Sequence, residues 1–189
     1  MIKKIPKRKR TENMCMAAVK NDSEAIHYVP KKFKTEELCN AAVEYDGNVL
    51  KYVPMQMRTE KVCLTAVTND GAALEYVPEH LRTEKMYKAA VCSGGWKLRD
   101  VPEEFRTEEI CMLAFLPKNY DKDICFDGDS LHYDGSLYYV PMELRTEEMC
   151  RIAVNYNPFN IRFVPKEVCT EYIVSVAIKS YAPILDFVD

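Results

Sequence analysis

The sequence predicts an all-α solenoid, a stack of short helical repeats, and three observations lead to that prediction. Prolines recur every 24 residues, at Pro6, Pro30, Pro54, Pro78 and Pro102 and again at Pro141 and Pro165. Threonines follow the same period, and apolar residues follow each threonine at helical spacing. A fixed period of this size is typical of a repeat array, in which stacking buries a core that one repeat cannot bury alone.

Seven repeats account for residues 1–189 as a single helical repeat domain. They start at Thr11, Thr35, Thr59, Thr83, Thr107, Thr146 and Thr170. The step from Thr107 to Thr146 is 39 residues instead of 24, so the fifth repeat carries a 15-residue insertion. The pattern leaves the handedness of the superhelix and the oligomeric state open.

Each threonine is expected to begin a helix of about ten residues. In the third repeat, Val62, Cys63, Ala66 and Val67 fall on one helical face. The threonine hydroxyl can accept a hydrogen bond from the first turn, and the glutamate that follows it suits the positive end of the helix dipole. The helix is therefore predicted to start at the residue after each threonine.

A turn rich in Asn, Asp and Gly follows each helix, as at residues 69–71. We expect left-handed backbone geometry there, with the aspartate capping a second, shorter helix. In the third repeat that helix carries Leu74, Tyr76 and Val77, and Pro78 ends it. After the proline, one apolar residue per repeat is expected to pack between layers: Phe33, Met57, Leu81, Phe105 and Leu144.

Composition and charge favour a cytoplasmic protein. Its net charge is -3, and no apolar run reaches the length of about 18 residues that a membrane helix needs. The basic start, residues 1–10, lacks the apolar stretch of a secretory signal. We therefore expect no membrane partner.

Five of the eight cysteines stand four residues after a repeat threonine: Cys15, Cys39, Cys63, Cys111 and Cys150. Equivalent atoms of stacked helices lie about 10 Å apart, too far for a disulfide. We interpret these residues as small core side chains with free thiols. No Cys-x-x-Cys pair is present, so neither a metal nor a cofactor is expected.

The repeat motif Tyr-Val-Pro-x-x-Leu-Arg-Thr-Glu-x-x-Cys-x-x-Ala-Val is clearest at residues 76–84 and 139–154. It resembles a repeat family of unknown function that is scattered through bacterial and viral proteins. The period and layout are also similar, more weakly, to leucine-rich variant repeats. The resemblance implies architecture only, because the family brings no catalytic residues.

Deviations from the repeat identify a candidate site for a protein partner. The fourth repeat has Tyr87 in place of the cysteine, two glycines before Trp96, and Asp100 in place of the tyrosine; the fifth repeat has the insertion. The candidate contact residues are Trp96, Tyr120, Asp123, Phe126, Asp127, Asp129, His132 and Tyr133. Loops that leave an array often bind partners, and aromatic residues dominate interfaces. The alternative is local repacking around a tolerated insertion.

The insertion also raises metal and enzyme hypotheses, and both are weak. Its aspartates do not fit a calcium loop, which ends in glutamate, so a solvated turn or a small hairpin at Asp127-Gly128 is the better interpretation. Cys125 and His132 have no orienting partner or oxyanion element in the sequence. We therefore expect no enzymatic activity.

The function that this pattern favours is a non-enzymatic protein-binding scaffold. One form is a stoichiometric inhibitor, adaptor or effector that acts on a host or phage-defence protein. The alternative is a nucleic-acid-binding array that uses the basic N-terminus and a ladder of cations before the threonines: Arg10, Lys34, Arg58, Arg82, Arg106 and Arg145. A glutamate two residues after each cation instead favours salt bridges within the repeat.

Overall fold

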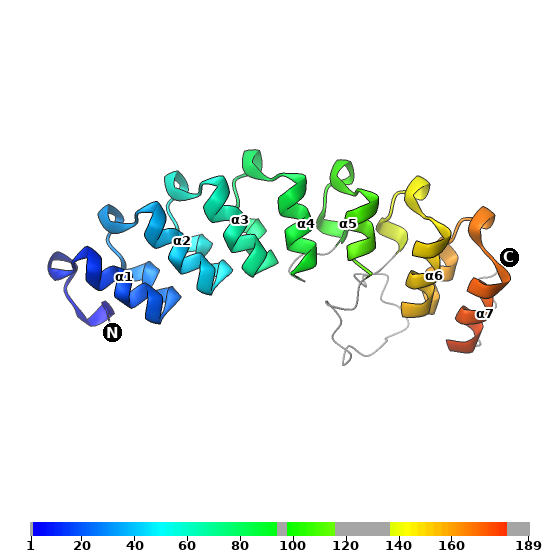
Figure 1. Ribbon diagram of the computed structural model, residues 1–189, viewed down its shortest axis with the longest axis horizontal. Coiled ribbons are helices and arrows are strands. Elements are labelled where there is room, and N and C mark those ends of the chain that lie inside the picture. The colour runs from blue at the N-terminus through cyan, green and yellow to red at the C-terminus, as the bar shows by residue number, and fades with distance from the viewer. Residues whose placement is uncertain (1, 94–97, 116–136, 181–189) are drawn as a thin grey trace. The chain divides into compact units, whose positions relative to one another are not determined.

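The computed structural model describes residues 2–93, 98–115 and 137–180. In these ranges the chain consists of helices and turns, without a strand. Contacts divide the chain into two compact units, Met1–Trp96 and Lys97–Asp189. Each unit is built from successive repeats (Figure 1). The predicted all-α repeat architecture is confirmed, whereas the expectation of one domain over residues 1–189 stays a prediction.

One α-helix follows each repeat threonine, as predicted. The helices are α1 (Glu12–Asn21), α2 (Glu36–Tyr45), α3 (Glu60–Asn69), α4 (Glu84–Cys92), α5 (Glu108–Leu113), α6 (Glu147–Tyr156) and α7 (Glu171–Ser180). In every repeat except that of Thr83, the threonine Oγ1 accepts a hydrogen bond of 3.3 or 3.4 Å from the amide three residues later. The capping prediction is therefore confirmed for six of these seven threonines.

Where the structure describes it, the second helical segment of a repeat is a 3-10 helix. The six-residue segments are η3 (Ser23–Tyr28), η5 (Gly47–Tyr52), η7 (Gly71–Tyr76) and η14 (Pro158–Phe163). The Asp or Asn before each of them accepts a hydrogen bond from the amide two residues later, which is the predicted cap. At the same place in other repeats lie η1 (Ile2–Lys4), η9 (Leu98–Asp100) and η12 (Leu137–Tyr139), each of which directly follows residues outside the described ranges.

The predicted left-handed geometry of the turn is wrong. The capping residues Asp46 and Asp70 are extended, with φ of -153° and -141°. The glycines that follow are needed for space: a Cβ on Gly47 or Gly71 would overlap the carbonyl oxygen of Ala66 or Ala90 in the next helix. These glycines therefore allow close packing of consecutive repeats.

A three-residue 3-10 turn follows each repeat proline and leads to the next threonine. These turns are η2 (Lys7–Lys9), η4 (Lys31–Phe33), η6 (Met55–Met57), η8 (Glu79–Leu81), η10 (Glu103–Phe105), η13 (Met142–Leu144) and η15 (Lys166–Val168). The apolar residues predicted to pack between layers, such as Phe33 and Leu81, are half-buried there.

The core of the first unit consists of the recurring apolar positions. Helices α1 to α4 pack as successive neighbours, and η3, η5 and η7 pack behind them in the same order. In α2 the inward residues Leu38, Cys39, Ala42 and Val43 are fully buried. The opposite face of α2 carries exposed residues, among them Glu37 and Glu44.

In the second unit the buried amide of Asn160 replaces an apolar side chain of the repeat. Its Oδ1 accepts a hydrogen bond of 2.9 Å from the amide of Leu137, and its Nδ2 donates one of 2.9 Å to the carbonyl of Ala153. Leu137 is the first described residue after the gap at 116–136. Asn160 thus ties η12 and α6 to η14.

Candidate functional site

The partner-binding residues expected from the sequence lie outside the described residues. These are Trp96, Tyr120, Asp123, Phe126, Asp127, Asp129, His132 and Tyr133, together with Cys125. Of the other deviations, Tyr87 is buried in the core and Asp100 is exposed, with its Oδ1 3.4 Å from Nε of Arg99.

The ladder of cations before the threonines holds neighbouring repeats together. Arg58 donates from Nε to the carbonyl of Val53 in its own repeat, at 3.0 Å, and from Nη1 to the carbonyl of Tyr76 in the next repeat, at 2.6 Å. Arg145 repeats both contacts with Val140 and Phe163. Lys34 makes only the second contact, from Nζ to the carbonyl of Tyr52 at 2.6 Å.

Five cations of the ladder are therefore inter-repeat staples: Arg10, Lys34, Arg58, Arg106 and Arg145. Among the described residues no ion pair joins these cations to the repeat glutamates, so the expected salt bridges within the repeat are not found. Burial lowers the pKa of Lys34 and of Arg145, because both charges lie partly inside the stack. Side chains committed to carbonyl oxygens do not form the free ladder that phosphates need.

The cysteines of the core are poor candidates for chemistry. All five are buried and free. Burial raises the pKa of Cys39, Cys63, Cys111 and Cys150 to about 11, an effect that the neighbouring cation only partly offsets. Because the thiolate is the reactive form, these thiols are inert near neutral pH.

An open groove of about 600 Å³ crosses the exposed faces of α1, α2 and α3 in the first unit. We call it the α-face groove. Its lining consists of Met16, Lys20, Glu36, Glu37, Asn40, Ala41, Glu44 and Lys61. Most of these residues belong to α2, at the positions left outside when Leu38, Cys39, Ala42 and Val43 face the core. The groove thus follows from the same helical periodicity that forms the core.

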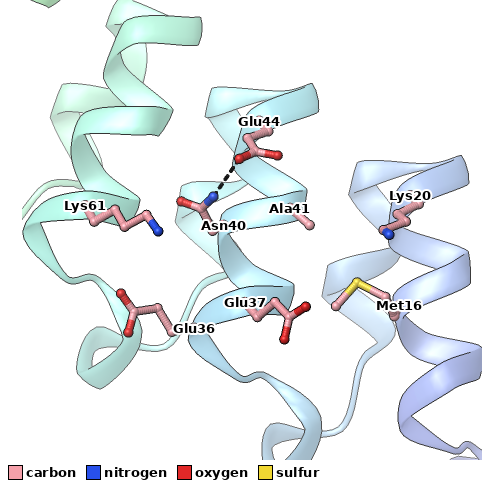
Figure 2. Close-up of a pocket in the computed structure, with 8 residues that line it drawn as sticks. All are labelled: Met16, Lys20, Glu36, Glu37, Asn40, Ala41, Glu44 and Lys61. Carbon is pink, nitrogen blue, oxygen red and sulfur yellow. Dashed lines mark hydrogen bonds between the residues drawn. The ribbon is translucent and has the colours of Figure 1, made fainter.

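The centre of the α-face groove is acidic and its margins are basic. Figure 2 shows Glu37 pointing toward Met16 and α1, whereas Glu36 points to the side of α2 where Lys61 lies. The carboxylate of Glu36 accepts a hydrogen bond of 3.0 Å from Thr59, and that of Glu44 accepts one of 2.7 Å from Asn40. Within the described part of the chain, Glu37 has no hydrogen-bond or ion-pair partner.

This arrangement suits a polypeptide better than a small molecule. Small-molecule sites are mostly enclosed and apolar, whereas this groove is open and lined mainly by charged side chains. Its apolar contribution comes from Met16 and Ala41, which are half-buried. Sequence reasoning missed the groove because its residues differ from repeat to repeat; that variation at outward positions was the available signal.

Two other kinds of site are absent from the described ranges. No group of three or more His, Cys, Asp and Glu side chains there could hold a metal ion. None of the helices in those ranges has both the length and the apolar character required to cross a membrane.

Comparison with known proteins supports the repeat architecture. A family model described as a domain of unknown function (DUF4116) matches residues 11–58 and, again, residues 35–82. The two matches are offset by one 24-residue repeat, and each spans two repeats. No curated protein and no solved structure matches the chain. Residues 11–82 are therefore similar to a repeat family whose function is unknown.

Proposed function

We propose that the protein is a non-enzymatic repeat scaffold that binds a segment of another protein in the α-face groove. The observation behind this proposal is the contrast between two sets of positions on the same helices. The buried positions repeat almost unchanged, whereas the outward position two residues after the threonine is Asn13, Glu37, Lys61 and Lys85 in successive helices. Packing between repeats requires the buried residues to recur. Recognition of a specific partner requires the outward residues to differ from repeat to repeat.

The charge of the groove defines the segment that it would bind. Glu37 is an exposed carboxylate without a partner among the described residues, so an arginine or lysine of the segment would complete an ion pair with it. Apolar atoms of the segment would cover Met16 and Ala41. Binding by occupancy makes the protein an adaptor, or an inhibitor when the covered segment belongs to the partner's working surface.

A matched pair of variants tests this proposal. Ala41→Trp fills the groove, whereas Ala89→Trp places the same side chain at the equivalent position of α4, outside the groove. A partner isolated with the wild type should be lost with Ala41→Trp and retained with Ala89→Trp, while circular dichroism shows both variants to be folded. Retention by both variants would exclude the groove as the binding site.

A further inference from the structure

Positive charge is concentrated at the N-terminal end of the first unit. Residues 1–34 contain ten lysines and arginines and three acidic residues, a net charge of +7, although the whole chain carries -3. Five of these cations are exposed on the turns η2 and η4, and we call them the basic ridge: Lys7, Arg8, Lys9, Lys31 and Lys32. The turns occupy equivalent positions in consecutive repeats, so their side chains belong to one edge of the stack.

The fold does not need cations at these positions. The next turns, η6 and η8, have the same proline before them and the same closing hydrogen bond, yet their exposed residues are Met55, Gln56, Glu79 and His80. Grouping like charges without acidic neighbours disfavours the folded state through repulsion. Because backbone geometry is the same with or without the charges, the ridge calls for an explanation other than stability.

The basic ridge is also available for binding. Arg10 and Lys34, which follow η2 and η4, are bound to carbonyl oxygens of the stack. In the described residues, by contrast, none of the five ridge cations forms a salt bridge. Lys32 lies over the ring of Phe33, with its Nζ 4.6 Å from the ring centroid, which leaves its charge exposed.

We propose that the basic ridge binds the phosphate backbone of double-stranded nucleic acid without reading its bases. Binding of cations to phosphates needs no apolar contact, because release of counterions drives it. The ridge turns carry no exposed large apolar side chain, so they lack the anchor that membrane insertion requires and the aromatic centre typical of protein interfaces. They also offer no exposed ring on which unpaired bases could stack, which favours a duplex.

Salt dependence and charge-matched variants test this assignment. The probe is a fluorescent 20-base-pair DNA duplex, measured by anisotropy between 25 and 200 mM KCl. The ridge variant carries Lys7→Gln, Arg8→Gln, Lys31→Gln and Lys32→Gln. The control variant loses the same charge at exposed lysines elsewhere: Lys20→Gln, Lys51→Gln, Lys61→Gln and Lys85→Gln.

The wild type should bind with a slope of log K against log [salt] no steeper than about -4.5, the value for five phosphate contacts. The ridge variant should lose at least about tenfold in affinity and most of this slope, and the control variant less than about threefold. Equal losses in both variants, or a wild type that does not bind at 25 mM KCl, would overturn the proposal. So would equal or tighter binding to poly-glutamate or to phosphatidylserine vesicles at the same salt concentration.

A variant with added lysines gives a second test of the proposal. It should gain affinity for the duplex, and loss of folding cannot produce such a gain. Met55→Lys with Gln56→Lys extends the ridge to the third turn and should tighten duplex binding and steepen the salt slope. The same two charges placed at Tyr45→Lys and Thr68→Lys, on α2 and α3, should have a smaller effect. A larger effect from this second pair would contradict the assignment to the ridge.

Discussion

The guanidinium of Arg106 donates from Nη1 to the carbonyl oxygen of Tyr139, at a distance of 3.1 Å. The two residues are 33 positions apart, whereas the equivalent pair Arg58 and Tyr76 is separated by 18. The difference of 15 is the length of the insertion. The staple between the fourth repeat and the second helix of the fifth repeat therefore keeps its register across the inserted residues.

The staples should contribute measurably to stability. Arg58→Ala removes three hydrogen bonds to carbonyl oxygens, those of Lys51, Val53 and Tyr76. We expect a loss of about 2–3 kcal/mol in the free energy of unfolding by urea, because bonds from a charged donor are lost and part-buried carbonyls stay unpaired. Arg58→Lys should lose less, since Lys34 shows that a lysine reaches the next repeat. The exposed Arg99→Ala is the control, with an expected change within about 0.5 kcal/mol.

The equivalent threonines Thr35 and Thr83 should contribute differently to stability as helix caps. Thr35 accepts a hydrogen bond from the amide of Leu38 at 3.3 Å, whereas Thr83 makes no side-chain cap bond. Thr35→Ala should therefore cost about 1 kcal/mol and Thr83→Ala much less. Urea unfolding of both variants measures the difference, and equal costs would contradict the capping geometry.

Because consecutive repeats pack closely, we expect that Gly71 cannot be replaced by a residue with a Cβ without a loss of stability. A Cβ at Gly71 meets backbone atoms of Ala90, which cannot move without displacing α4. Gly71→Ala should lower the free energy of unfolding by about 1–3 kcal/mol, the usual cost of overpacking. Ser23 occupies the same position in the first repeat and already has a Cβ. Ser23→Ala adds no atom there and should be nearly neutral in the same assay.

The core thiols predict a specific pH dependence. Burial raises the pKa of Cys63 to about 11 from the ordinary 9.0. Between these two values the unfolded thiol has lost its proton and the folded one has not, so stability falls as pH rises. The stabilising contribution of Cys63 is thus complete below pH 9 and disappears as pH rises through 11.

Comparison of the wild type with Cys63→Ala isolates this effect. The difference in their free energies of unfolding should be constant from pH 7 to 8.5 and should shrink by pH 10.5. Val67 is buried on the same helix and has no titratable group, so the difference between wild type and Val67→Ala should stay unchanged over the same range. A Cys63→Ala difference that does not vary with pH would show that the thiol is not protected by burial.

The sequence was sufficient to predict features that depend on contacts within one repeat. The helix starts, the threonine caps and the aspartate caps involve residues two or three positions apart, so they can be read from the repeat itself. The buried cysteines were predictable because they share one helical face with other apolar residues. These local rules also explain why the all-α class was predicted correctly.

Features that arise from stacking could not be predicted in the same way. The acceptor for Arg58 is a carbonyl 18 residues away, which comes close only when two repeats pack, so a nearby glutamate was the wrong expectation. From the sequence we expected left-handed backbone geometry at Gly47 and Gly71. The structure shows instead that the next helix packs too closely to leave room for a Cβ at these positions. The α-face groove combines dissimilar residues from three helices, and no periodic signal marks it.

The most direct test of the proposed scaffold is site-specific photocrosslinking. A benzophenone amino acid is placed at position 41 in the groove, at position 89 on the same face of α4, or at position 123 in the insertion, and the protein is irradiated in the presence of the isolated partner. We expect a crosslink from position 41 that is lost with Glu37→Lys and kept with Glu148→Lys, which makes the same charge change at the equivalent position of α6. Crosslinks from position 89 or 123 without one from position 41 would contradict binding in the α-face groove.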